Sequence, residues 1–188
     1  AASDVYKRQS KGRAEEILLG AKTSACVLRV PMVLGEGDYA SGALLTRGAQ
    51  ERSFAFRPES LEQPIYAGDV IKAVGQAALL KHAGALDLAG AESLSRKELL
   101  QRVAACMGKT TSVVGLPITL GYAIAACMQA LLANPPLTSA MLGVLDHDDD
   151  IDPTPALQAL QMQALCGVET TINKLLATNA DAELKKAD

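Results

Sequence analysis

The chain has 188 residues, enough to bury a hydrophobic core and form one domain, or one domain with a small appendage. Apolar residues make up 49% of it, but aromatic residues only 3% and tryptophan none, so Ala, Leu, Val and Met must fill the core. The four cysteines occur singly, without a C-x-x-C pair. We therefore expect small buried hydrophobic residues in a reducing compartment, with a catalytic thiol as the alternative. They are Cys26, Cys106, Cys127 and Cys166.

The net charge of −3 is spread unevenly along the chain. Residues 1–57 carry nine basic and six acidic groups, residues 58–145 carry six of each, and residues 146–188 carry three basic and nine acidic. The acidic end argues against nucleic acid and against an anionic membrane surface as partners of that part. The first residues lack the apolar run of a signal peptide, which favours a cytoplasmic location.

The first nine residues differ in character from the rest. The string AASDVYKRQ resembles the translation of a sequencing adapter, which would make it a non-native tail on a truncated gene product. The native chain would then begin at about Ser10. An ordinary frayed N-terminus is the alternative.

A short apolar run from Ala25 to Leu34 is the central feature of the sequence. It is dense in Val and Leu and ends in Gly-x-Gly, which is typical of a strand buried on both faces in a parallel sheet. Helices are predicted on either side of it, over Ser10–Leu19 and Ala40–Gln50. This order indicates a doubly wound α/β fold, whose ligands bind beyond the carboxyl ends of the strands.

The middle of the chain alternates between extended and helical patterns. Asp69 is predicted to cap a helix over Val70–His82, and Ser95-x-x-Glu98 is a capping box that opens a helix ending at Met107. The predicted extended segments are Ser53–Arg57, Gln63–Gly68 and Ala85–Ala89, with a polar loop over Pro58–Glu62.

From Thr110 to Leu145 the chain has 36 consecutive residues without a charge. Pro117 suits a helix start, and Ile118–Ala133 is predicted to be an apolar helix that is shorter than the ~20 residues needed to span a bilayer. We expect it to be buried or to line a groove, with a helix lying on a membrane surface as the alternative. Shorter helices are predicted from Thr138, from Thr154-Pro155 and over Thr171–Leu176.

The segment Gly35-Glu36-Gly37-Asp38-Tyr39-Ala40 formally matches the G-x-G-x-x-G/A dinucleotide fingerprint. However, Glu36 and Asp38 would place two negative charges beside a pyrophosphate, which needs backbone amides and a positive helix end. We therefore interpret the match as coincidental.

A longer series of short motifs carries a family resemblance. Together they resemble the C-terminal half of an extended or atypical short-chain dehydrogenase/reductase, between about Ser10 and Leu176. The motifs are Ser10-Lys11-x-x-Ala14-Glu15, Leu28-Arg29-x-Pro31, Gly35-x-Gly37-Asp38, Gln63-Pro64-Ile65-Tyr66-x-x-Asp69-Val70 and Leu88-Ala89-Gly90.

Within that superfamily, three further segments look closest to bacterial NAD(P)-binding proteins similar to the 39 kDa-type accessory subunit of respiratory complex I. They are Leu116-Pro117, Asn134-Pro135-Pro136-Leu137-Thr138 and the loop from Leu145 to Asp152.

The resemblance implies an α/β fold: the C-terminal part of a Rossmann-like doubly wound parallel sheet, over residues 10–109, and a mainly helical substrate or interaction subdomain over residues 110–188. It also implies NAD or NADP as the cofactor. The family's phosphate-binding glycine loop belongs to an N-terminal half that this sequence does not include.

The family's catalytic dyad is Tyr-x-x-x-Lys on a helix, where both side chains face the cofactor. Its lysine binds the nicotinamide ribose and lowers the tyrosine pKa. Lys11 matches that lysine, but Lys7 stands where the tyrosine belongs. Tyr6 lies five residues before Lys11, roughly 140° away round the helix, and cannot form the same dyad. Either the tail has replaced the tyrosine, which we favour, or the protein lacks it. A solvated helix lysine is the alternative for Lys11.

The resemblance assigns two further groups of residues. Pro31, Met32 and Val33 would contact the nicotinamide end of the cofactor, with a purely core role as the alternative. Gln63, Tyr66 and Asp69 would line the substrate pocket.

The acidic run from Asp146 to Asp152 invites comparison with a metal site. It lacks the turn glycine and distal glutamate of a calcium loop, and His147 has no second histidine nearby, so we expect a solvated loop and no metal. His82, at a predicted helix end, is expected at the surface.

Two functions remain open. The first is an NAD(P)-dependent enzyme that reduces or epimerises a small oxygenated substrate. The second is a non-catalytic NAD(P)-binding accessory or assembly factor of respiratory complex I, located peripherally at the inner membrane. A tyrosine four residues before Lys11 in the native gene would favour the enzyme.

Overall fold

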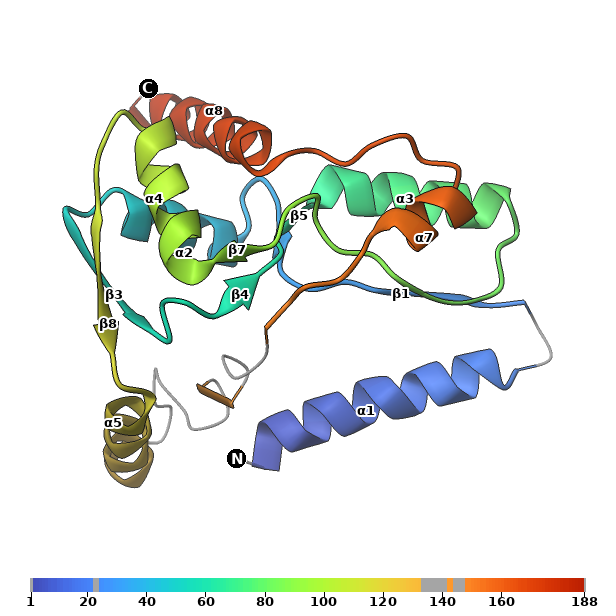
Figure 1. The fold of residues 1–188 in the computed structure, drawn as a ribbon, viewed down its shortest axis with the longest axis horizontal. Coiled ribbons are helices and arrows are strands. Elements are labelled where there is room, and N and C mark those ends of the chain that lie inside the picture. Colours follow the sequence, from blue (N-terminus) through green and yellow to red (C-terminus); the bar gives the residue numbers. More distant parts are fainter. Residues whose placement is uncertain (1, 22–23, 133–141, 144–147, 188) are drawn as a thin grey trace.

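The computed structural model describes residues 2–21, 24–132, 142–143 and 148–187, with side chains described between residues 9 and 179 (Figure 1). Helices and strands alternate along most of it, which is the pattern of an α/β fold. The helices are α1 (Ala2–Leu19), α2 (Tyr39–Gly48), α3 (Ala67–Leu79), α4 (Arg96–Cys106), α5 (Ile118–Leu131), α7 (Thr154–Ala159) and α8 (Val168–Ala187). The strands are β1 (Cys26–Arg29), β2 (Val33–Leu34), β3 (Arg52–Phe56), β4 (Leu61–Glu62), β5 (Ile65–Tyr66), β6 (Gly84–Asp87), β7 (Leu94–Ser95) and β8 (Ser112–Leu116).

Parallel pairing dominates among these strands. β1 pairs with β6 from Cys26 opposite Gly84 to Arg29 opposite Asp87, β2 pairs with β5, and β3 pairs with β8, all in parallel. The two-residue strands β4 and β7 pair antiparallel. The predicted α/β class with parallel strands is confirmed.

Strand β1, formed by the apolar run that dominates the sequence, is less buried than its composition suggests. β1 is half-buried over Cys26, Val27 and Leu28, and Arg29 is exposed, so the prediction of burial on both faces is wrong. Cys26 and Leu28 pack into a core shared with α3, whereas Arg29 forms an ion pair with Glu15 of α1. Because successive side chains of a strand point to opposite faces, α3 and α1 lie on opposite faces of β1.

Of two predicted helix caps, Ser95 is confirmed and Asp69 is wrong. Ser95 caps α4 as expected, since its hydroxyl oxygen accepts the Glu98 N–H at 3.1 Å, but the Glu98 carboxylate binds Arg102 at 2.8 Å instead of closing the capping box. The Asp69 cap is wrong. α3 begins at Ala67, so Asp69 lies inside its first turn and the cap position belongs to Tyr66.

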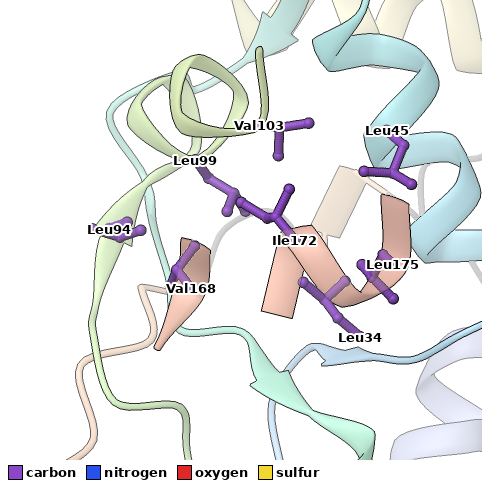
Figure 2. Close-up of a cluster of buried hydrophobic side chains, with 8 residues drawn as sticks. All are labelled: Leu34, Leu45, Leu94, Leu99, Val103, Val168, Ile172 and Leu175. Carbon is purple, nitrogen blue, oxygen red and sulfur yellow. The ribbon is translucent and has the colours of Figure 1, made fainter. Parts of the chain in front are cut away.

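Two hydrophobic clusters hold the elements together. In the first, α2, α4 and α8 converge on Leu34 at the end of β2, with Ile172 of α8 completely buried among them (Figure 2). The second lies between β1, β6, α3 and α7 around Ala73, Leu88 and Leu160. Leu34 and Ile65, on neighbouring strands, belong to different clusters, so the β2–β5 pair joins the two halves of the core.

The charge-free segment forms strand β8 and then α5. Several large side chains of α5 are exposed, and Leu131 is 83% accessible. No helix within the described ranges is both long and apolar enough to cross a membrane. The predicted helix at Thr138 falls outside the described residues, and the placement of α5 on a membrane surface stays a prediction.

Candidate active site at the ends of β2 and β5

The parallel strands β2 and β5 end side by side, and the predicted site residues gather around them. Lys11 is the exception among these predicted residues, since it lies on α1. Val33 pairs with Ile65, and the carbonyl oxygen of Met32 accepts the Ile65 N–H at 2.8 Å. Pro31, Met32 and Val33 are half-buried; Met32 packs against the first cluster and Val33 against the second. Their predicted contact with a cofactor stays a prediction, and the core packing that was its alternative is present for Met32 and Val33.

The turn after β2 is built around Asp38. Its carboxylate caps α2, accepting the Ala40 N–H at 3.2 Å, the Ser41 N–H at 2.9 Å and the Ser41 hydroxyl at 2.8 Å. These hydrogen bonds, those from Ser41 above all, lower the pKa of Asp38. The first amides of α2 therefore already hold an anion that belongs to the protein.

The glycines of the same turn have local reasons to be there. A Cβ at Gly35 would lie 3.0 Å from the Cβ of Ala67, and Gly37 has a φ of +75°, which side-chain-bearing residues rarely adopt. The Gly-x-Gly-Asp pattern is thus accounted for by packing and capping, without a bound phosphate.

Tyr66, at the end of β5, carries the most perturbed group of the site. Its hydroxyl donates to Oε1 of Glu36 at 2.6 Å, and the ammonium of Lys174 from α8 lies 4.1 Å from its ring centroid. The hydrogen bond to Glu36, followed by burial, raises the pKa of Tyr66 to about 12. The same bond lowers the pKa of Glu36. At neutral pH the phenol is therefore a hydrogen-bond donor held in its protonated form.

The buried side chain of Gln63 joins two loops by hydrogen bonds. Its side-chain amide donates to the carbonyl oxygens of Gly90 and Ile151, both at 2.8 Å, and its Oε1 accepts the Ile151 N–H at 2.8 Å. Both amide hydrogens and the oxygen are engaged by backbone groups. The predicted contact of Gln63 with a substrate is not tested by this arrangement, but its polar atoms already have partners within the chain.

Asp69, in the first turn of α3, is also buried and hydrogen-bonded within the chain. It is 1% exposed, and its carboxylate accepts the Cys166 N–H at 2.6 Å and an N–H of the Lys72 ammonium at 3.1 Å. It thus fixes the segment that leads into α8. Its predicted role toward a substrate remains a prediction.

Lys11 lies apart from this group, on the exposed surface of α1. That helix packs against β1, where Glu15 binds Arg29, which also reaches Asp87 of β6. Among the described residues, Lys11 has no hydrogen bond or ion pair with Tyr66, Gln63 or Asp69. The predicted substrate residues are thus neighbours in the chain around β5 and the first turn of α3, each with its own partners, and the predicted dyad lysine lies outside their contacts.

Two members of the site were missed from the sequence. Glu36 was judged only by its charge beside a phosphate, and Lys174 lies more than a hundred residues from Tyr66 in the chain. For Glu36, the signal in the sequence was its position two residues after the predicted strand, at the carboxyl end where α/β folds bind ligands.

The acidic run of the C-terminal region has structural partners where it is described. Asp148 accepts the Ser60 hydroxyl at 2.8 Å and the Leu61 N–H at 3.0 Å, and Asp152 accepts the Thr154 N–H at 2.9 Å. Asp146 and His147 fall outside the described residues. In the part of the chain that the structure describes, no group of three or more His, Cys, Asp or Glu residues is placed to hold a metal ion.

Comparison with known proteins identifies the fold. No protein-family model and no curated protein sequence matches this chain. Among solved structures, it is similar to gox2253, with a TM-score of 0.69 and 14% identity over 92% of this chain and 54% of the other.

The human epimerase family protein SDR39U1, crystallised with NADPH, gives a TM-score of 0.69 and 18% identity over 89% of this chain and 53% of the other. The ADP-L-glycero-D-manno-heptose-6-epimerase of Helicobacter pylori gives 0.65 and 17% over 91% and 50%. The chain thus has the fold of these Rossmann-like proteins and spans about half their length.

Proposed function

We propose that this chain is the C-terminal part of an NAD(P)-binding protein of the short-chain dehydrogenase/epimerase type, whose intact form transfers hydride on a small oxygenated substrate. One observation carries the proposal: the chain is similar over 89% of its length to a structure crystallised with NADPH, and over 92% to one crystallised with NAD and UDP. The gathering of polar side chains beyond the carboxyl ends of β2 and β5 supports it, because α/β folds bind ligands there.

In this proposal, the residues of this chain serve one end of a nicotinamide cofactor. The half-buried apolar segment Pro31–Val33 suits the flat nicotinamide ring, and Lys11 would donate to the ribose hydroxyls. The phosphates do not fit at Gly35–Asp38, because the Asp38 carboxylate occupies the α2 N-terminus. The cofactor, when bound, would donate or accept the hydride according to its oxidation state, and the phosphate-binding part is assigned to the N-terminal half of the intact protein.

On the substrate side, Tyr66 is the residue best suited to contact a ligand. It is half-buried, with its hydroxyl at the carboxyl end of β5, and it is held protonated. Gln63 and Asp69 would act beneath it by fixing the loops at Gly90, Ile151 and Cys166.

The division of the chain belongs to the same proposal. Residues 1–9 are a non-native tail, residues 10–109 complete the cofactor-binding domain, and residues 110–188 form the helical subdomain. The first strand of the second part, β8, pairs with β3 of the first, so the two parts share a sheet.

The second candidate is a non-catalytic NAD(P)-binding accessory or assembly factor associated with respiratory complex I, peripheral at the inner membrane. The exposed apolar side chains of α5 favour it, since Leu120, Ile124 and Leu131 suit contact with another protein or a membrane surface.

A substitution at Lys11 separates the two candidates. In the intact protein, Lys11→Ala removes a charged hydrogen bond to the ribose, and we expect cofactor affinity to fall roughly ten- to a hundredfold. Arg13→Ala is the matched control, because Arg13 is an exposed cation on the same helix. Affinity is measured by titration calorimetry and turnover by nicotinamide absorbance.

An enzyme loses more turnover than affinity in Lys11→Ala, because the lysine would also lower the pKa of the proton-transferring tyrosine that we expect four residues before it in the native gene. A binding subunit loses affinity and has no turnover to lose. Equal affinities for Lys11→Ala, Arg13→Ala and the unmodified protein would make Lys11 a surface lysine and remove it from the site.

A further inference from the structure

Tyr66 brings together two charged side chains from distant parts of the chain. Its hydroxyl donates to the Glu36 carboxylate at 2.6 Å, and the Lys174 ammonium lies 4.1 Å from its ring centroid. The phenol O–H and the ammonium are both hydrogen-bond donors, and the ammonium also carries a full positive charge. Two donors of this kind at one ring are complementary to an anion.

The charge of Lys174 is not balanced by an ion pair. Among the residues whose side chains the structure describes, no carboxylate lies within 4.0 Å of its ammonium. The pKa of Glu36 is lowered first by the hydrogen bond from Tyr66, and Lys174 adds to this effect by its charge. Lys174 thus influences Glu36 through space, without the close contact of a salt bridge.

The other carboxylate near Tyr66 belongs to Asp69, and it already has partners. Asp69 is 1% exposed and accepts the Cys166 N–H at 2.6 Å and an N–H of the Lys72 ammonium at 3.1 Å. Its negative charge is therefore offset within the chain. Once Glu36 is set aside, the positive charge of Lys174 remains for a ligand.

Tyr66 and the helix that carries Lys174 are held in place by packing. A Cβ at Gly68 would lie 2.3 Å from Cε1 of Tyr66, so the ring rests directly on the backbone of the first turn of α3. Lys174 lies on α8 between Ile172 and Leu175, which are 0% and 2% exposed in the first hydrophobic cluster. The phenol and α8 therefore form a rigid frame, as a binding site requires.

Glu36 is the member of the cluster that can leave. Its side chain is exposed, and among the described residues Tyr66 is the one other residue to which its carboxylate is hydrogen-bonded. It stands between Gly35 and Gly37, and Gly37 has a φ of +75°. An exposed contact of a charged group contributes little to stability, because water competes for both partners. A ligand can therefore replace the Glu36 carboxylate at small cost.

We propose that Tyr66 and Lys174 form a subsite for an anionic group of the substrate, a carboxylate or a phosphate, and that Glu36 holds the phenol until this group displaces it. The proposal rests on the proposed function and deepens it, because it makes the small oxygenated substrate an acidic one. The anionic group accepts the Tyr66 O–H and pairs with the Lys174 ammonium, whereas Glu36 makes only the first of these contacts.

The intact protein, expressed from the complete gene, provides the direct test. Tyrosine labelled with ¹³C at Cζ reports the hydrogen bonding of each phenol by NMR, and the Tyr66 signal is the one that disappears in Tyr66→Phe. Sodium phosphate and sodium malonate are the probes, titrated without cofactor at constant ionic strength because salt screens exposed charges. We expect the Tyr66 signal to shift saturably with at least one probe. The absence of a saturable shift with both would overturn the proposal.

Three substitutions of exposed residues assign the shift to the subsite. Lys174→Met should weaken binding of the active probe about five- to tenfold, because a charge-assisted contact is lost. Glu36→Gln removes the competing carboxylate and should strengthen binding by about threefold or more. Lys109→Met, which removes a lysine between α4 and β8, is the matched control and should change nothing. Equal affinities in Lys174→Met and Lys109→Met, or in Glu36→Gln and the parent, would overturn the proposal.

The two probes distinguish the source of the anion. A response to phosphate alone assigns a phosphorylated substrate, a response to malonate alone a carboxylic acid, and either result supports the subsite. The proposed function is tested separately, by titration with NAD(H) and NADP(H). An intact protein that binds a probe at Tyr66 but no nicotinamide cofactor keeps the subsite and refutes the proposed function. One that binds a cofactor but shows no response at Tyr66 keeps the proposed function and refutes the subsite.

Discussion

At the scale of single residues, Asp38 shows how a short motif can mislead. Its sequence context matches a dinucleotide fingerprint, yet its carboxylate takes the amides that a phosphate would need. The two acidic residues of the motif allowed this outcome to be anticipated from the sequence. The partners of Asp38 could not be, because the hydroxyl of Ser41 binds both Asp38 and the Gly35 N–H only in the folded turn.

Removing the Asp38 carboxylate tests this account of the turn. Asp38→Ala leaves the first amides of α2 without a partner and should lower the free energy of unfolding by about 1 kcal/mol, whereas Asp38→Asn retains an acceptor and should cost less. Urea denaturation at pH 7 measures both. Identical unfolding midpoints for Asp38→Ala and the parent chain would show that the cap contributes nothing.

The direction of the pKa shift of Asp38 also predicts how its contribution to stability depends on pH. Its pKa is lowered in the folded chain. Its contribution to stability is therefore present above the unfolded pKa of about 4 and is lost as the pH falls through the lower folded value. The difference in unfolding free energy between the parent chain and Asp38→Asn should shrink in that acid window.

The raised pKa of Tyr66 leads to a prediction about stability at alkaline pH. Its pKa is raised to about 12 by the hydrogen bond to Glu36. The stabilising effect is fully present below the unfolded pKa of about 10 and is lost as the pH rises toward 12. A spectrophotometric titration near 295 nm follows the ionisation of the tyrosines, and subtracting the curve of Tyr66→Phe isolates the step that belongs to Tyr66. That step should occur well above pH 10. Glu36→Gln should move that step toward 10; an unchanged step would mean that Glu36 is not its cause.

At the scale of elements, helix positions follow from the sequence more closely than strand pairings do. The glycines, caps and apolar spacing of the segments that form α2, α4 and α5 are local signals, and the structure has helices there. The pairing of β8 with β3 was not foreseen, because it joins residues about sixty apart and β8 lies in a long charge-free stretch that favours a helix. The helix cap assigned to Asp69 failed because Tyr66 already satisfies the extended geometry of a cap.

The contact between α2 and α4 can be tested with two glycines of the same helix. A Cβ at Gly48 would lie 2.3 Å from Cγ1 of the buried Val103, whereas a Cβ at Gly42 meets nothing within 4 Å. Gly48→Ala should therefore destabilise the fold by about 1–3 kcal/mol through overpacking. Gly42→Ala should stabilise it by roughly 0.5–1 kcal/mol, because alanine loses less backbone entropy in a helix.

Thermal unfolding of Gly48→Ala and Gly42→Ala, measured under the same conditions, tests how closely α2 and α4 approach each other. A stabilised Gly48→Ala would show that α2 and α4 do not approach as closely as described, and the packing of the first hydrophobic cluster would need revision.

At the scale of the whole molecule, the chain is an α/β unit with its candidate site at one end of a parallel strand pair. The fold class could be predicted because buried strands, glycine turns and helices alternate in the sequence. The site could be predicted only in part. Gln63, Tyr66 and Asp69 follow or precede strand ends in the sequence, whereas the partners that occupy them, at Ile151, Cys166 and Lys174, lie about ninety or more residues away.

β1 pairs with β6 along one edge, and no strand in the described part of the chain pairs with its other edge. Because this edge lies beside an apolar groove lined by Cys26, Val70 and Val74, it is a template for association, and residues 10–188 alone should aggregate or unfold with weak cooperativity. Calorimetric unfolding and the dispersion of amide NMR signals check this. A sharp thermal transition with well-dispersed signals would show that the unit is stable by itself.

Cofactor titration tests the proposed function most directly. NAD(H) and NADP(H) are titrated calorimetrically into the intact protein and into residues 10–188. The intact protein should bind one of them, and residues 10–188 should bind neither measurably, because Asp38 occupies the α2 N-terminus and the phosphates need an N-terminal half. Micromolar binding by residues 10–188 alone would contradict this account and make Gly35–Ala40 a genuine phosphate site. Absence of binding by the intact protein would contradict the proposed function itself.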